Sequence, residues 1–226
     1  MTWPFERTEL KSMAAQGRRK DRIAILASGA GSNAEAILAH FEGQAAAEVA
    51  EVVWVCTNRE MARVRQLAAK FGVEESHLSK AEMANGALLE DLQSRKVDWV
   101  VLAGFLLKVP KEVCEAYEGR MVNIHPALLP KHGGAGMFGM HVHRAVKEAG
   151  DIVSGMTIHF VNEDYDEGDV VFQAEVDLAP EDAPEDIAAK VLELEHRHYA
   201  QVLEGLIRLT HGTDIRDNTH LKSHKR

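Results

Sequence analysis

The stretch RIAILASGAGSNAEAILAHF, residues 22–41, joins an apolar run to a glycine-rich turn and an amphipathic segment. The run at 22–28 has the length and composition of a buried strand, and the turn with two glycines ends it. The apolar spacing over 34–41 predicts a helix, which Ser32 or Asn33 would cap. Strand, glycine turn and helix in this order are typical of the first unit of an α/β domain.

The same alternation continues along the chain. Further strands are predicted at 49–57, 76–79, 97–104, 121–125, 154–161 and 169–176. Further helices are predicted at 61–71, 82–95, 141–149 and 184–209. The fold class is therefore α/β, a Rossmann-like, mostly parallel sheet with helices on both faces, and the last two strands read as a hairpin or a wide connection that makes the sheet mixed.

One domain accounts for most of the 226 residues, because no linker or repeat divides the chain. We expect this domain at 22–209, an N-terminal extension at 1–21 and a polar C-terminal tail at 210–226. Apolar residues make up 46% and charged residues 27%, which excludes disordered and collagen-like chains.

The net charge indicates which classes of partner the protein binds, and the cysteines indicate the redox state of its compartment. A net charge of −9 argues against nucleic acid as the main partner. No apolar stretch approaches the roughly 20 residues of a membrane helix, and the N-terminus lacks a signal-peptide core. Cys56 and Cys114 form no CxxC motif, which fits a reducing compartment. We therefore expect a cytoplasmic protein with no membrane partner.

The loop at 28–33 is the first candidate binding site. Free backbone N–H groups and the dipole at a helix N-terminus favour an anion, so the loop is expected to bind phosphate, although a tight turn alone would look the same. The glycines also fit the dinucleotide pattern G-x-G-x-x-A. The acid expected about 20 residues later is missing from the segment 56–59, which argues against NAD and leaves NADP only through Arg59.

Asn123 and His125 are the candidate catalytic pair, since residues two apart on a strand share a face. A neutral imidazole exchanges protons near pH 7, and an amide N–H stabilises a developing oxyanion. An aspartate beside His125 would orient the ring and raise its pKa. Asp164 and Asp166 lie in an acidic turn, and such turns are usually solvated surface. The spacing alone does not show whether either carboxylate reaches His125.

Several histidines invite a metal-site reading: His125, His132, His141, His143 and His159. His141 and His143 would converge on zinc only in an extended segment, and on the predicted helix they diverge. The segment has no nearby cysteine and no HExxH motif. No metal is expected.

Four ordered blocks carry a resemblance to a known family: ILASGAGSN at 25–33, VVLAGFLLKVP at 100–110, MVNIHPALLPKHGG at 121–134 and GMTIHFVNEDYDEGDVVFQAEV at 155–176. With VLELEHRHYAQVL at 191–203, the chain resembles the phosphoribosylglycinamide formyltransferases, folate-dependent enzymes of purine synthesis. The resemblance implies formyl transfer from 10-formyltetrahydrofolate to glycinamide ribonucleotide. It does not decide whether the protein forms a homodimer or which conformation the 131–143 loop adopts.

The resemblance also implies roles for individual residues. Asn123, a protonated His125 and Asp166 would be catalytic, with Asp164 as the alternative to Asp166. Substrate-binding residues would be Gly31, Ser32, Asn33 and Glu195, the last at the ribose. The folate pocket would be lined by Leu106, Leu107, Lys108, Val109 and Asn123.

Two rival functions share this catalytic core, formyltetrahydrofolate hydrolysis and formylation of methionyl-tRNA. Both kinds of enzyme usually carry an additional domain, and the acidity of this chain disfavours tRNA. A non-catalytic nucleotide-binding module is the rival of a different class, because a phosphate loop alone does not require catalysis.

Overall fold

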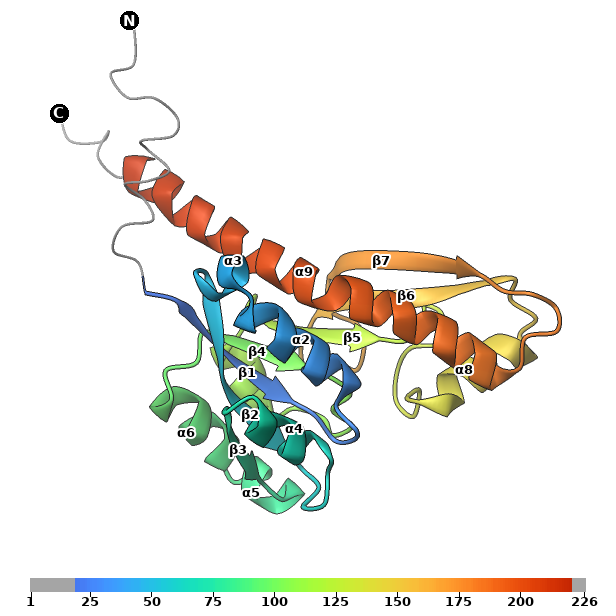
Figure 1. The fold of residues 1–226 in the computed structure, drawn as a ribbon, viewed down its shortest axis with the longest axis horizontal. Coiled ribbons are helices and arrows are strands. Elements are labelled where there is room, and N and C mark those ends of the chain that lie inside the picture. The colour runs from blue at the N-terminus through green and yellow to red at the C-terminus, as the bar shows by residue number, and fades with distance from the viewer. Residues whose placement is uncertain (1–18, 221–226) are drawn as a thin grey trace, which may run out of the picture.

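A seven-stranded sheet organises the protein (Figure 1). This computed structural model describes residues 19–220, with side chains through residue 211. The strands, in the spatial order β3-β2-β1-β4-β5-β6-β7, are β1 (Asp21–Leu26), β2 (Ala50–Thr57), β3 (Glu74–His77), β4 (Trp99–Leu102), β5 (Met121–His125), β6 (Val153–Phe160) and β7 (Val170–Asp177). Strands β1 to β5 are parallel, whereas β6 and β7 pair antiparallel, so the predicted mixed sheet is confirmed.

Helices cover both faces of the sheet. In chain order they are α2 (Ser32–Glu42), α3 (Gln44–Ala47), α4 (Val64–Lys70), α5 (Lys80–Ala84), α6 (Ala87–Ser94), α7 (Lys111–Ala116), α8 (Met140–Glu148) and α9 (Pro184–His220). The first core cluster takes side chains from α2, α3, α4, α8 and α9, and the second takes them from α5, α6 and α7. The predicted α/β class with helices on both faces is therefore confirmed.

Strand β1 shows why its sequence is a continuous apolar run rather than an alternating one. Ile23 and Ile25 face the first core cluster, while Ala24 and Leu26 face the second, and all four are fully buried. Successive side chains of a strand point to opposite faces, so a central strand covered on both faces needs apolar residues throughout.

Some predicted helix boundaries were wrong. The single helix expected at 82–95 is two helices, α5 and α6, because Gly86 adopts a left-handed φ of 93° between them. The short helices α3 and α7 were not predicted. The last helix does not stop near residue 209 but continues to His220, so the segment 210–220 of the expected tail is helical. The remainder of that tail and residues 1–18 of the expected extension lie outside the described residues.

The cap of α2 also differs from the sequence prediction. Gly31 is the N-cap, with φ of 83°, and no side chain makes a capping hydrogen bond there. Neither Ser32 nor Asn33 is a cap, since both lie inside the helix. A Cβ at Gly31 would lie 2.7 Å from Cγ2 of Val64, so glycine is required for packing as well as for backbone conformation.

The parallel strands place several loops at one edge of the sheet. The carboxyl ends of β1, β4 and β5 lie side by side, so the loops that follow them share that edge (Figure 1). Antiparallel β6 begins at that edge and runs back along β5, with His159 opposite Asn123. Among the helices of the described residues, none combines the length and apolar character required to cross a membrane.

Candidate active site

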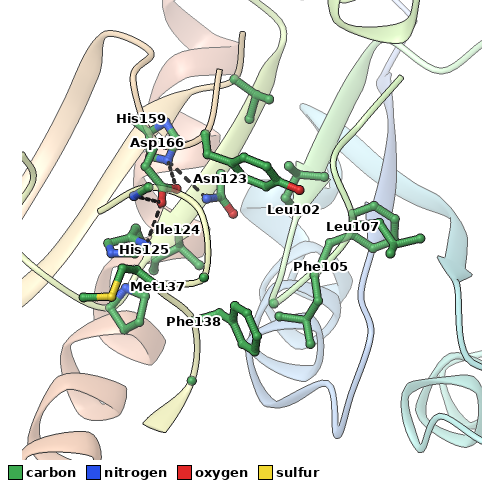
Figure 2. Close-up of a pocket in the computed structure, with 18 of the residues that line it drawn as sticks. Leu102, Phe105, Leu107, Asn123, Ile124, His125, Met137, Phe138, His159 and Asp166 are labelled. Atoms are coloured by element: carbon green, nitrogen blue, oxygen red, sulfur yellow. Dashed lines mark hydrogen bonds and ion pairs between the residues drawn. The ribbon is translucent and has the colours of Figure 1, made fainter. Parts of the chain in front are cut away.

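A cavity of about 400 Å³ opens at the carboxyl ends of β4 and β5 (Figure 2). Polar side chains of Asn123, His125 and Asp166 group on one wall. Apolar side chains, among them Phe105 and Leu107, form the opposite wall. A mostly apolar cavity with a few convergent polar groups is the usual form of a small-molecule site.

The polar wall is built from two paired strands. Asn123 and His125 lie two apart on β5 and both line the cavity, as their strand spacing predicted. His159 of β6 lies beside them, with its Nε2 3.1 Å from Nδ2 of Asn123. Nδ1 of His159 lies 2.8 Å from the carbonyl oxygen of Phe160, which can only accept, so Nδ1 carries a proton. Nε2 is the ring nitrogen that faces both the Asn123 amide and Oδ1 of Asp166.

Asp166 lies between the two histidines. Its Oδ2 is 3.4 Å from Nδ1 of His125 and its Oδ1 is 3.5 Å from Nε2 of His159. Asp164 also lines the cavity, but the carboxylate beside the His125 ring is that of Asp166. Asp166 adopts a left-handed φ of 58°, an uncommon conformation outside glycine that often marks functional residues.

The pKa values of His125 and Asp166 are both lowered, which favours a neutral ring and an ionised carboxylate. Burial lowers the pKa of His125, against a smaller opposing effect of Asp166, so the free enzyme holds a mainly neutral ring at pH 7. Burial alone would raise the pKa of Asp166, but the His159 ring, His125 and the Gly134 N–H outweigh it and the pKa is lowered. A neutral imidazole beside an ionised carboxylate can take up a proton and hold it as the imidazolium.

The loop after β5 holds both members of the pair. Nε2 of His125 donates to the carbonyl oxygen of His132 at 2.8 Å, which leaves Nδ1 as the nitrogen that exchanges a proton. The backbone N–H of Gly134 donates to Oδ2 of Asp166 at 2.9 Å. The sequence left the conformation of this loop open; the structure shows that it contributes backbone groups to the site.

A second polar pair lies farther along the cavity. Nδ2 of Asn33 on α2 donates to Oε2 of Glu195 on α9 at 2.7 Å, and both residues line the cavity. Burial raises the pKa of Glu195 to about 7, although the Asn33 hydrogen bond acts to lower it. Oδ1 of Asn33 is buried with no hydrogen-bond partner, an acceptor that a ligand hydroxyl or amine could satisfy.

Gly31 and Ser32 lie near this pair but outside the lining of the main cavity. Gly31 is the N-cap of α2, and Ser32 lines a neighbouring cavity of about 330 Å³ with the basic residues Arg63 and Lys70. The first loop therefore offers an N-terminal helix end and nearby cations, which suit an anion.

Residues 106–109 line the main cavity, and side-chain contacts of Ser28 and Tyr165 fix this segment in place. The backbone N–H of Leu106 donates to the Ser28 hydroxyl at 2.9 Å, and that hydroxyl donates to Asn58 at 2.6 Å. The Lys108 ammonium lies 5.8 Å from the centre of the Tyr165 ring, which also lines the cavity. Segments following β1, β4 and β6 are thus tied together at the cavity wall.

Comparison with known proteins identifies the family. A family model for formyl transferases matches residues 21–203. A chloroplastic phosphoribosylglycinamide formyltransferase of Arabidopsis thaliana is 38% identical, covering 86% of this chain and 68% of that protein. The phosphoribosylglycinamide formyltransferase of Haemophilus influenzae is 35% identical, covering 83% of this chain and 90% of that protein. The chain belongs to the phosphoribosylglycinamide formyltransferase family.

Solved structures of phosphoribosylglycinamide formyltransferases share its fold. Glycinamide ribonucleotide transformylase 1 from Symbiobacterium toebii superimposes with a TM-score of 0.76 at 32% identity, covering 85% of this chain and 93% of that one. The phosphoribosylglycinamide formyltransferase from Brucella melitensis gives a TM-score of 0.75 at 32% identity, covering 84% and 96% of the two chains. The Rossmann-like formyltransferase fold expected from the sequence is therefore confirmed.

His159 is the residue of this formyltransferase site that sequence reasoning did not single out. The sequence placed it among candidate metal ligands, but it pairs with Asn123 and Asp166 instead. It lies opposite Asn123 in the antiparallel pairing of β5 with β6, strands that a long segment containing α8 separates in sequence, so no local sequence signal marked the contact. Among the described residues, no group of three histidine, cysteine or acidic side chains is arranged to hold a metal ion.

Proposed function

We propose that this enzyme transfers the formyl group of 10-formyltetrahydrofolate to the amino group of glycinamide ribonucleotide. The observation that carries the proposal is the placement of His125, Asp166 and Asn123 on the polar wall of a cavity that is otherwise largely apolar. Membership of the phosphoribosylglycinamide formyltransferase family supports the same reaction. The formyl folate supplies the one-carbon group.

The nucleotide substrate would occupy the end of the cavity near α2. The backbone of Gly31, Ser32 and Asn33 begins this helix and is suited to the phosphate. Glu195 would bind the ribose, since its buried carboxyl group lies at the same end and can accept or donate a hydrogen bond to a hydroxyl. The orphan Oδ1 of Asn33 offers a further acceptor.

The folate would bind against residues 106–109, and the cavity fits such a group. Its wall there is apolar, with Phe105 and Leu107 available for a flat ring system, and backbone polar groups lie beside them. Asn123 would contact the folate from the polar side, at the formyl group. Lys108 is held over Tyr165 and adds a positive charge at the rim.

The residues of the polar wall account for the proton and charge movements of the reaction. As the amine attacks the formyl carbon, the Nδ2–H of Asn123 would stabilise the negative charge that develops on the formyl oxygen. Nδ1 of His125 would take the proton that the attacking amine loses, and Asp166 would stabilise the resulting imidazolium. His125 would then return that proton to the folate nitrogen as the carbon–nitrogen bond to it breaks.

An assay of folate deformylation tests this reaction directly. Wild-type enzyme and a His125→Ala variant are supplied with a 10-formyl folate, with and without glycinamide ribonucleotide, in the presence of a chelator. The proposal expects deformylation that requires the amine, survives chelation and falls about 10³-fold in the variant. Deformylation without the amine would identify a hydrolase instead, and unchanged turnover in the variant would remove His125 from the mechanism.

Several wider expectations remain predictions. We propose residues 22–209 as the catalytic domain, which the family match over 21–203 supports. Small molecules are the proposed partners, with neither nucleic acid nor membrane, and a cytoplasmic location and a homodimer are still to be tested.

A further inference from the structure

A network of charged side chains lies behind His125, on the side away from the cavity lining. Nε2 of the His132 ring is 2.7 Å from Oδ2 of Asp151, and Nζ of Lys131 is 2.7 Å from Oδ1 of the same carboxylate. Asp151 does not line the main cavity, and the mechanism proposed above gives it no contact with a reacting group.

The network acts on the backbone of His132. Its carbonyl oxygen accepts from Nε2 of His125, and that hydrogen bond defines which ring nitrogen faces Asp166. His132 presents this carbonyl from a left-handed backbone with φ of 54°. A non-glycine residue is disfavoured in this conformation, so neighbouring contacts must hold it there.

Asp151 supplies that restraint. Its side chain is 16% exposed and that of His132 is 15% exposed, so their contact is largely shielded from water. The Lys131 and His132 side chains lower the pKa of Asp151, which keeps the carboxylate ionised and able to accept both hydrogen bonds at neutral pH. The restraint also reaches Asp166, because Gly134, two residues after His132, donates its N–H to that carboxylate.

We propose that Asp151 is a positioning residue, which holds the His132 backbone so that its carbonyl orients the His125 ring for proton transfer. The inference rests on the proposed function, since it assigns Asp151 a part in the same reaction. Asp151 lies outside the lining of the cavity in which both substrates would bind. Its loss therefore lowers turnover while leaving substrate binding intact, because a small misplacement of a catalytic group costs up to about 100-fold in rate.

Steady-state kinetics of the full-length enzyme test the proposal. Asp151→Ala is expected to lower kcat about 10-fold or more, with KM for both substrates within about twofold of wild type. Asp151→Asn keeps an oxygen that accepts from the His132 ring and should recover most of the loss. Asp182→Ala is the matched control, because Asp182 also pairs with a lysine, Lys190, but lies outside the cavity lining. This control should retain wild-type kcat.

A double-mutant cycle separates positioning from general destabilisation. His132→Gly removes the ring that Asp151 holds, while glycine adopts the left-handed backbone without strain. Because both substitutions break one contact, the double variant with Asp151→Ala should lose no more kcat than the more affected single variant, within about twofold. Multiplicative losses, or a wild-type kcat in Asp151→Ala, would overturn the proposal.

Nitrogen NMR of the His125 ring measures which ring nitrogen carries the proton, and so tests the ring orientation directly. The wild-type ring should be protonated at Nε2, and Asp151→Ala should show a mixture of tautomers. An unchanged spectrum with a lowered kcat would show that Asp151 acts by another route. The His125→Ala variant distinguishes the two proposals: if it is fully active, the proposed mechanism fails, whereas if it is inactive and Asp151→Ala is fully active, only the positioning role fails.

Discussion

The two ends of the cavity are constructed differently. At the α2 end, the glycine turn, the helix N-terminus and Asn33 come from one short segment, 28–33, and only Glu195 is distant in sequence. At the catalytic end, Asn123, His159 and Asp166 come from two strands and a turn, and a loop after β5 adds backbone groups. A binding loop can thus be specified locally, whereas this catalytic group depends on strand pairing and loop packing.

The largest expected contrast is between one glycine of β6 and one glycine of the first loop, in their tolerance of a methyl group. A Cβ at Gly155 in β6 would lie 2.0 Å from the carbonyl oxygen of Ala174, whereas a Cβ at Gly29 in the first loop meets nothing within 4 Å. Gly155→Ala should therefore lower the free energy of unfolding by about 4 kcal/mol, and Gly29→Ala by less than about 0.5 kcal/mol. Urea denaturation of both variants measures this, and equal effects would contradict the contrast.

Asp166→Asn tests the electrostatics of the catalytic end. Without the carboxylate charge, the imidazolium of His125 loses its partner, and kcat should fall about 100-fold. Asp166 acts to raise the pKa of His125, so its loss lowers that pKa further. Because the proposed mechanism uses neutral His125 as the base, the acid limb of kcat/KM should move to lower pH. A limb that stays in place, or moves to higher pH, would assign it to another group; Asp164→Asn is the matched control and should keep the wild-type limb.

Glu195 tests the α2 end through stability. Burial raises its pKa from 4.5 to about 7, so the folded protein favours the protonated acid. This contribution is complete below about pH 4.5 and is lost as the pH rises through 7, a loss of about 2 kcal/mol between pH 5 and 7. Wild-type Tm should fall by about 4–8 °C over this range relative to Glu195→Gln, which has no titrating carboxyl group there. Parallel Tm curves for the two proteins would show that the carboxyl group is not perturbed.

The smallest effect is expected from Gly31→Ala, which disturbs the first loop alone. The left-handed φ and the 2.7 Å approach to Val64 would shift the start of α2. KM for glycinamide ribonucleotide should rise about 10-fold while kcat stays within about twofold, because the catalytic end is untouched. Gly29→Ala serves as the control in the same loop, and an equal fall of kcat in Gly31→Ala would show that the two ends are coupled.

Much of the fold could be predicted from the sequence because its signals are local. The run at 22–28 identified a buried strand, since a central strand needs apolar residues on both faces. Boundaries were less certain where one residue decides them, as at Gly86, whose left-handed backbone separates two helices that the apolar spacing joined. The length of α9 was also underestimated, because its last turns are polar.

The sequence by itself determined the α/β order, the anion-favouring first loop, and the pairing of Asn123 with His125 on one strand face. These follow from the period of a strand, the conformational freedom of glycine and the direction of a helix dipole, which are properties of neighbouring residues. Only the tertiary structure placed His159 against Asn123, made the His132 carbonyl a partner of His125, and selected Asp166 over Asp164. It also buried Glu195 against Asn33 and raised its pKa. Desolvation and contacts between distant residues exist only once the sheet and helices have packed, so no local pattern encodes them.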